Sequence, residues 1–278
     1  MHNKEKCLIT GSRGFLGTQL YYWLSDGRHD IETINRRDSL DLIKDFQPDI
    51  VYHLAAAGSK KGDYTNEEIL KTNIGLTQDL LSACRDIPYR AFINFSSSSV
   101  YGKKDKPMKE SDDPAPEFLY AESKVVAEAF CGYECFKYKK PIVSIRPFSI
   151  VGPKMQETKL IPTVIRSIKN DIPLNLIDGN HDFLDVRDLL SALDIIIYNI
   201  DQLKGGVVNI GSGIQTSNIE VVRICEEVLN KKAIISEVEF KHNHSQVDSK
   251  KWQADITKIK RLGWEPKITL RESIEGMI

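Results

Sequence analysis

The feature that most constrains the fold is a regular alternation of apolar segments and helix-like segments through the first 150 residues. Short apolar runs typical of buried strands alternate with stretches that favour helices. Strands are expected at 7–10, 30–35, 49–56, 91–97 and 141–147, and helices at 14–26, 39–46, 65–85 and around Tyr120. This order is typical of an α/β protein in which helices cover both faces of a doubly wound parallel sheet.

The alternation loosens after Pro153. Helices are expected at 159–169, 185–199, 216–230 and 255–262, with strands near 205–213 and 234–240. We therefore predict a main sheet domain formed by residues 1–152 plus 183–210. A smaller C-terminal part would comprise residues 153–182 plus 211–278.

Charge and composition exclude several functional classes. The net charge is -1 and the pI is near 6.6, which gives no electrostatic basis for nucleic-acid binding. No apolar run long enough for a membrane span is present, and the N-terminus lacks the apolar stretch of a signal peptide. The five cysteines have no disulfide-framework spacing, and the six histidines form no metal motif. We expect a cytoplasmic, reduced protein that binds no metal, nucleic acid or membrane.

A glycine-rich turn, "CLITGSRGFLG", follows the first expected strand. Gly11, Gly14 and Gly17 stand between this strand and the first helix. Glycine allows the backbone to turn tightly and approach a pyrophosphate, whose charge a helix N-terminus favours. The alternative is a glycine-rich helix entry that binds nothing. Because the turn opens an alternating pattern, we predict a Rossmann dinucleotide-binding domain, with the smaller part binding the substrate.

The residues after the second strand indicate which dinucleotide binds. NAD-binding domains place an acidic residue there for the ribose 2′-hydroxyl. This chain instead has Asn35, Arg36 and Arg37. A guanidinium pairs bidentately with a 2′-phosphate, and Arg13 adds a further cation, so NADP (as NADPH) is the expected cofactor, with NAD less favoured. The alternatives are that the arginines are merely solvated, or that Asp38 binds NAD.

Two Tyr-x-x-x-Lys pairs lie on one expected helix, Tyr120 with Lys124 and Tyr133 with Lys137. With ten tyrosines, about one such pair is expected by chance, so the spacing alone identifies no site. Four serines, at 96–99, end the strand before this helix. The carboxyl ends of parallel strands are where such folds bind ligands, so the serines and one of the pairs form a candidate chemical unit.

These stretches together resemble the extended short-chain dehydrogenase/reductases, specifically the NAD(P)-dependent nucleotide-sugar epimerases, dehydratases and reductases. The resemblance covers nearly the whole chain and is carried by "TGSRGFLG", "DIVYHLAA", "FINFSSSSVYG", "YAESK", "IRPFSIVGP", "HDFLDVRDL", "NIGSG" and "ADITKIKRLGWEP". It implies that Tyr120 is the general acid/base, Lys124 its electrostatic partner and a ligand of the cofactor ribose, and Ser97 the donor to the substrate carbonyl. Tyr133 and Lys137 are then the chance pair.

The resemblance also implies the binding contacts. Those to the cofactor are Gly11, Ser12, Arg13, Gly14, Phe15, Leu16, Gly17, Arg36, Arg37, Leu54, Ala55, Ala56, Tyr120, Lys124 and Pro147. Those to a nucleotide-diphosphate sugar are Ser98, Ser99, Phe148, Ser149, Lys159 and His181. Phe148 is equally compatible with a core position. His181 stands where the family often has a diphosphate-binding arginine, and the candidate replacement cations are Lys159, Arg166, His244, Lys250 and Lys251.

A neighbouring ammonium is expected to activate Tyr120. A free phenol has a pKa of about 10, which is too high for efficient proton transfer near neutrality. A cation about 5–6 Å away, at an effective dielectric constant of about 20, favours the phenolate by roughly 3 kcal/mol, or about two pKa units. We therefore expect a lowered pKa for Tyr120.

The residues after Ser97 separate the branches of the family. Dehydratases carry an Asp-Glu pair there, and Ser98 and Ser99 argue against dehydration. The arginines and the single helix between residues 38 and 48 favour an NADPH-dependent reductase acting on the C4 keto group of a 4-keto-6-deoxy nucleotide sugar. The alternatives are an NAD-dependent nucleotide-sugar 4-epimerase and a non-catalytic NADP-binding regulator. The resemblance further implies a homodimer formed through the helices near 65–85 and 118–138.

Overall fold

The structure is a computed structural model that describes residues 4–35, 38–58, 64–239 and 251–278. By Cα proximity the chain divides into two compact units. Unit 1 comprises Met1–Val100, Pro116–Arg146 and Leu193–Val208, and unit 2 comprises Tyr101–Ala115, Pro147–Ala192 and Asn209–Ile278. Within the described residues, no helix combines the length and the apolar character that a membrane crossing requires.

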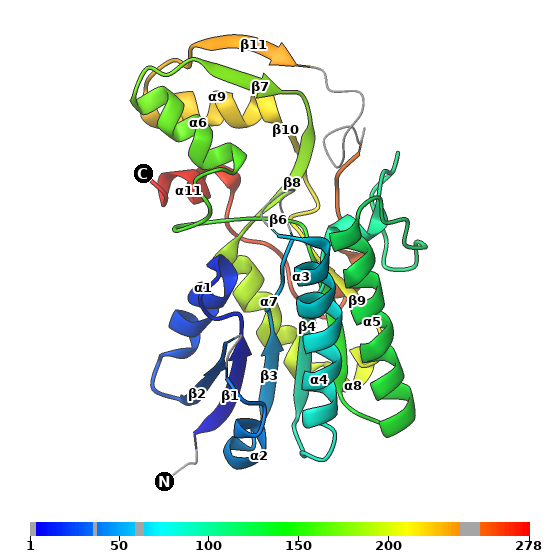
Figure 1. Ribbon diagram of the computed structural model, residues 1–278. Coiled ribbons are helices and arrows are strands. Elements are labelled where there is room, and N and C mark those ends of the chain that lie inside the picture. Colours follow the sequence, from blue (N-terminus) through cyan, green and yellow to red (C-terminus); the bar gives the residue numbers. More distant parts are fainter. Residues whose placement is uncertain (1–3, 36–37, 59–63, 240–250) are drawn as a thin grey trace. The chain divides into compact units, whose positions relative to one another are not determined.

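Six strands form a central parallel sheet in the order β2-β1-β3-β4-β5-β9 (Figure 1). They are β1 (Glu5–Thr10), β2 (His29–Ile34), β3 (Ile50–His53), β4 (Ala91–Phe95), β5 (Ile142–Pro147) and β9 (Val207–Ile210). β1 lies between β2 and β3, so the chain moves outward in both directions from the first strand. The predicted α/β, Rossmann-type doubly wound sheet is confirmed.

Helices alternate with these strands, as predicted. They are α1 (Phe15–Leu24), α2 (Leu42–Phe46), α3 (Asn66–Leu70), the π-helix η1 (Lys71–Gly75), α4 (Leu76–Ala83), the 3₁₀ turn η2 (Ser98–Tyr101), α5 (Leu119–Tyr138), α7 (Val186–Tyr198) and α8 (Ile200–Leu203). The helix expected at 65–85 is therefore interrupted by a π-helical turn. It begins at a capping box in which Thr65 and Glu68 each accept the other's backbone N–H.

Alternate strand residues supply the core of unit 1. Leu8, Val51 and Phe92 point to one face of the sheet and pack with Leu80 of α4 and Cys131 of α5. The residues between them face the other side, where the Asp194 carboxylate of α7 interacts electrostatically with His29 and Tyr52. Helices therefore cover both faces, and the buried strands read as continuous apolar runs for this reason.

Unit 2 contains shorter strands in two small sheets, β10-β8-β6 and β11-β7. The strands are β6 (Ser149–Val151), β7 (Leu174–Ile177), β8 (Asn180–Asp185), β10 (Gln215–Ser217) and β11 (Ile235–Glu239). The helices are α6 (Leu160–Lys169), α9 (Asn218–Leu229), α10 (Thr257–Lys260) and α11 (Leu270–Glu275). Apolar residues of α6, α9, β7 and α11 form one buried cluster.

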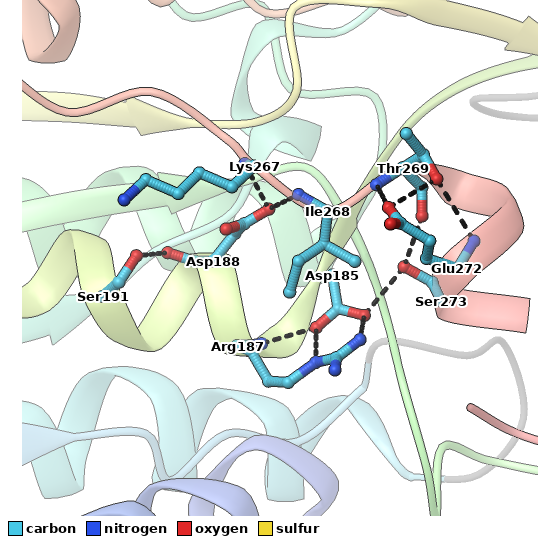
Figure 2. A network of polar contacts seen from close by, with 9 residues as sticks. All are labelled: Asp185, Arg187, Asp188, Ser191, Lys267, Ile268, Thr269, Glu272 and Ser273. Carbon is cyan, nitrogen blue, oxygen red and sulfur yellow. Dashed lines mark hydrogen bonds and ion pairs between the residues drawn. The ribbon is translucent and has the colours of Figure 1, made fainter. Parts of the chain in front are cut away.

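Two buried aspartates hold the C-terminal segment to the start of α7 (Figure 2). The Asp188 carboxylate accepts the backbone N–H groups of Lys267 and Ile268 at 3.0 and 2.9 Å. Asp185 accepts the hydroxyl of Ser273 at 2.7 Å and pairs with the Arg187 guanidinium. We call this set the aspartate clamp. Because it satisfies backbone donors that no strand or helix uses, it fixes an irregular stretch of chain.

Candidate active site

The glycine turn has the close backbone packing that a dinucleotide site needs. Gly11 adopts a positive φ of 74°, and a Cβ there would lie 2.7 Å from the backbone nitrogen of Ala55. A Cβ on Gly17 would lie 2.2 Å from the carbonyl oxygen of Gly11. No larger residue fits at either position. Helix α1 begins after Gly14 with no side-chain cap and no acidic residue in its first turn, which leaves its N–H groups available to an anion.

The segment after β3 lies against this turn. Leu54 and Ala55 donate their backbone N–H groups to the carbonyl and the hydroxyl of Thr10, each at 3.2 Å. This segment, Leu54 to Ala56, is the second group of predicted cofactor contacts. The structure therefore brings the two groups together, and they fit a dinucleotide phosphate site.

The cations predicted to select NADP are only partly described. Arg36 and Arg37 lie outside the described residues, and Arg13 is exposed in the glycine turn. Asp38, the alternative NAD ligand, accepts the backbone N–H and the side-chain amide of Asn35 at 2.7 and 3.2 Å. The carboxylate of Asp38 is thus engaged within its own loop.

Tyr120 and Lys124 occupy the first turns of α5, beside the end of β4. Lys124 is 4% exposed, and its ammonium donates to the carbonyl oxygen of Phe95 at 2.8 Å. The ammonium nitrogen lies 5.8 Å from the centroid of the Tyr120 ring. Tyr120 itself stacks against the ring of Phe118 with an interplanar angle of 15°. The predicted phenol–ammonium pair is therefore present, with the ammonium buried and the phenol partly exposed.

The expected direction of the Tyr120 pKa is wrong. Burial raises the pKa of Tyr120 above its ordinary value, and a hydrogen bond with Ser97 only partly opposes this effect. Burial also lowers the pKa of Lys124 to about 8, although the nearby Glu128 carboxylate favours its charged form. Burying a phenolate costs free energy, and this cost outweighs the Coulomb attraction expected from a neighbouring ammonium. Tyr120 is therefore a neutral phenol at pH 7.

The serines after β4 explain how Ser97 is oriented. The Ser97 hydroxyl oxygen accepts both the backbone N–H and the hydroxyl of Ser99, at 3.1 and 2.8 Å. Since Ser97 accepts twice from Ser99, its own proton is left for Tyr120 or for a substrate oxygen. Ser98 and Ser99, predicted as substrate contacts, are 5% and 1% exposed. Ser99 therefore orients Ser97.

A buried ion pair beneath these residues was missed by the sequence analysis. Arg146 of β5 donates to both carboxylate oxygens of Glu128 at 2.9 and 2.6 Å, and Ser96 donates to the same carboxylate. Glu128 lies one helical turn beyond Lys124 on α5. The i, i+4 spacing of Lys124 and Glu128 was a usable signal, but it did not reveal the distant partner Arg146.

Three predicted substrate residues come together in unit 2. The hydroxyl of Ser149 lies 3.3 Å from Nδ1 of His181, and the charge of Lys159 is close enough to affect that ring. Burial, with Lys159 adding to it, lowers the pKa of His181 to about 4. His181 is consequently neutral at pH 7. It offers a hydrogen bond rather than the positive charge of an arginine.

The other predicted unit 2 residues vary in position. Pro147 ends β5, and Phe148 is 6% exposed between the rings of Tyr101 and Trp252, which is a core position. Arg166 turns back to Glu157 at the start of α6. The backbone of Lys251 pairs with that of Lys104 in an isolated antiparallel β-bridge. His244 and Lys250 lie outside the described residues.

One group of potential metal ligands occurs in the described part of the chain. Atoms of Glu5, Cys7 and His29 lie within 4.8 Å of one another at the start of β1 and β2. Glu5 pairs with Arg90, and Nδ1 of His29 lies 3.1 Å from Asp26. These ion pairs already account for the polar groups there, at the opposite end of β1 from the glycine turn.

A family model and several known proteins match most of this chain. A family model described as "NAD dependent epimerase/dehydratase family" matches residues 7–211. The low-salt glycan biosynthesis protein Agl12 of Haloferax volcanii is 29% identical, over 98% of this chain and 96% of its own length. GDP-6-deoxy-D-mannose reductase of Pseudomonas aeruginosa is 25% identical, over 99% of this chain and 96% of its own length.

A solved structure has the same fold and carries ligands. It is a mutant of UDP-glucuronic acid 4-epimerase from Bacillus cereus in complex with UDP-4-deoxy-4-fluoro-glucuronic acid and NAD. Its TM-score is 0.87 at 26% sequence identity, and the match covers 98% of this chain and 97% of that one.

Proposed function

Because the chain belongs to the NAD dependent epimerase/dehydratase family, we propose that it is an NADPH-dependent reductase of a nucleotide-linked 4-keto-6-deoxy sugar. The family resemblance carries the general class, which is NAD(P)-dependent chemistry on nucleotide sugars. The single observation that carries the choice of reduction is the sequence after β2, where Arg36 and Arg37 stand in place of the acidic residue of NAD-binding domains. Tyr120 beside Lys124 supplies the proton. Reduction of a carbonyl needs a proton donor at the start of the reaction, whereas oxidation of an alcohol needs a base.

In this proposal each residue has one task. When bound, the nicotinamide supplies the hydride that the C4 carbon receives. Ser97 donates a hydrogen bond to the carbonyl oxygen and polarises it. Tyr120 transfers its phenolic proton to that oxygen, which becomes the C4 hydroxyl. The Lys124 ammonium stabilises the phenolate until solvent returns the proton.

Two further observations support this reading over neighbouring ones. The Asp-Glu pair of the dehydratases is replaced by Ser98 and Ser99, which are buried and offer no acid for the loss of water. The engaged carboxylate of Asp38 and the exposed Arg13 support NADP over NAD. A 4-epimerase remains the second candidate, because the solved relative with 26% identity is a 4-epimerase that holds NAD.

The cofactor decides between the two enzymes. We would denature the purified protein, identify any released nucleotide, and titrate the remaining protein with NADPH and NADH. Weak binding with a preference for NADPH supports the reductase, and NADPH consumption with a panel of 4-keto-6-deoxy nucleotide sugars then defines the substrate. Stoichiometric NAD that co-purifies contradicts the proposal and makes the 4-epimerase the better assignment. An unchanged physiological effect of Tyr120→Phe would support the non-catalytic regulator instead.

We also propose a homodimer formed through α4 and α5, which lie side by side (Figure 1). Their outer surface exposes Tyr133 (53%) and Phe136 (77%) and contains a groove of about 380 Å³. The groove is lined by Gln78, Leu81, Ser82, Arg85, Ala129, Phe130, Tyr133 and Glu134. Apolar side chains exposed on adjacent helices favour burial against a second copy.

A further inference from the structure

The π-helical turn η1 places one amide deep inside unit 1. Asn73 lies in this turn and is 1% exposed. Its Oδ1 accepts the backbone N–H of Ala57 at 2.8 Å, and its Nδ2 donates to the carbonyl of Ala57 at 2.9 Å. A π-helical turn inserts one extra residue into a helix, and such turns are frequent at functional sites. In this turn, Asn73 therefore binds both backbone groups of Ala57, the last residue of the 54–57 segment.

The second Nδ2 proton of Asn73 connects this segment to the catalytic helix. It is donated to the hydroxyl of Ser123 at 2.8 Å, and Ser123 donates to the carbonyl oxygen of Tyr120 at 2.7 Å. Ser123 is 1% exposed and lies between Tyr120 and Lys124 on α5. One hydroxyl therefore separates the Asn73 amide from the backbone of the proposed acid.

The other side of Asn73 is held by His53. The hydroxyl of Thr77 donates to the backbone carbonyl of Asn73 and lies 2.8 Å from Nε2 of His53. Since the single proton of Thr77 goes to a carbonyl, Nε2 of His53 must carry a proton. The Thr10 hydroxyl then donates to Nδ1 of His53 at 2.7 Å. The hydrogen-bond pattern thus assigns a proton to Nε2, and Nδ1 is the acceptor when the imidazole is neutral.

This assignment agrees with the surroundings of the imidazole. His53 is 2% exposed, and burial, with the Lys124 charge adding to it, lowers its pKa to about 3. The whole chain of hydrogen bonds is therefore uncharged and saturated. It runs from Ala55, through Thr10, His53 and Thr77, to Asn73.

We propose that Asn73 is a positioning residue that couples the cofactor-binding segment 54–57 to Tyr120 through Ser123, and that His53 holds Asn73 in register. This inference rests on the proposed role of Tyr120. The segment is tied at Ala55 through Thr10 and at Ala57 through Asn73, and α5 is tied at Ser123. A displacement of the segment therefore also moves the Tyr120 phenol. The cofactor, which donates the hydride, and Tyr120, which donates the proton, thus keep their positions relative to each other.

Ser123→Ala tests the coupling with little disturbance, because alanine is favourable in a helix and only one hydroxyl is lost. Ser144→Ala is the matched control. Ser144 is 2% exposed and likewise accepts from an asparagine amide, that of Asn94 at 2.9 Å, within the sheet. We expect both variants to melt at similarly reduced temperatures. Only Ser123→Ala should lower kcat, by ~10-fold, with a change in the Kd for NADPH of about twofold or less.

A second readout needs no substrate. The titration of Tyr120 is obtained from ultraviolet difference spectra of each variant against the same variant carrying Tyr120→Phe. Loosening of α5 admits water to the phenol, so Ser123→Ala should move the midpoint down toward its ordinary value of about 10, and Ser144→Ala should not. Asn73→Ala, which also frees Ala57, should show the same shift and in addition weaken NADPH binding.

The outcomes separate this inference from the proposed function. Equal kcat and equal titration midpoints in the two serine variants, both folded, overturn the coupling while leaving the reductase intact. A shifted midpoint in Ser123→Ala, in a protein that reduces none of the sugars tested, supports the coupling and rejects the substrate assignment.

Discussion

The two Tyr-x-x-x-Lys pairs on α5 have the same spacing and different surroundings. Lys124 is 4% exposed and donates to the end of β4, and Tyr120 beside it is partly enclosed. Tyr133 is 53% exposed, packs edge-on against Tyr138, and is followed by an exposed Lys137. The i, i+4 spacing only places two side chains on one helical face. Burial and the partners Ser97 and Phe95 give the first pair its chemistry.

The largest expected difference between the pairs is the loss of the proton donor. Tyr120→Phe should reduce kcat by ~10²–10⁴-fold, because the phenolic proton has no replacement in the site. Tyr133→Phe should leave kcat unchanged. Steady-state rates of both variants check this prediction, and equal rates would show that the first pair is as incidental as the second.

Removal of the ammonium should have the next largest effect. Lys124→Met is expected to lower kcat by ~10²-fold, since a phenolate formed at Tyr120 loses its neighbouring positive charge. Lys137→Met, on the exposed end of the helix, should have the wild-type rate. The comparison uses the same assay, with circular dichroism to confirm that both variants fold. A wild-type rate for Lys124→Met would contradict the assigned role.

Lys124 should also give the catalytic rate and the stability a pH dependence. The pKa of Lys124 is lowered by burial from 10.5 to about 8, so the catalytic rate should fall as the pH rises through about 8. Between pH 8 and 10.5 the unfolded chain binds more protons than the folded one at this position, so the contribution of Lys124 to stability increases with pH. Rate and denaturation profiles of the wild type and Lys124→Met test both signs. A rate that stays constant to pH 10 in the wild type is incompatible with this value.

The exposed end of α5 should affect assembly more than chemistry. Because a charge would be buried in the interface, Phe136→Glu is expected to convert a dimer to monomers, as measured by sedimentation velocity. The kcat should change by at most about twofold. Tyr198→Glu provides a control, since Tyr198 is 85% exposed on α7. If the wild-type protein sediments as a monomer, the proposed dimer interface is contradicted.

The sequence predicted the sheet because the sheet depends on local pattern, whereas the choice of Tyr120 and Lys124 over Tyr133 and Lys137 rested on the family resemblance. Alternation of apolar and amphipathic stretches is enough to place β1 to β5, and Gly11 and Gly17 announce a turn that admits no side chain. Of the short strands of unit 2, β11 was predicted near 234–240, whereas β6, β7, β8 and β10 were missed. β6 and β10 have three residues each, too few to show a period of two.

The remaining errors concern interactions between residues that are far apart in sequence. Asn73 and Ser123 are separated by 50 positions. Glu128 of α5 pairs with Arg146 of β5, 18 positions further along the chain. The pKa of Tyr120 was assigned the wrong direction because spacing reveals a neighbouring charge but not the extent of burial. The π-helical turn was also unpredicted, since "KTNIG" reads as ordinary helix.

The aspartate clamp has a consequence for how the chain tolerates change in length. Asp188 and Lys267 are 79 positions apart, so their hydrogen bond closes a long stretch of polypeptide without a covalent link. The entropic free-energy cost of closing a flexible loop grows only with the logarithm of its length, by about 0.6 kcal/mol for each doubling. Residues inserted at the surface within this stretch would therefore leave the closure nearly as favourable. The segment between α7 and α11 can thus gain length while its two ends stay fastened.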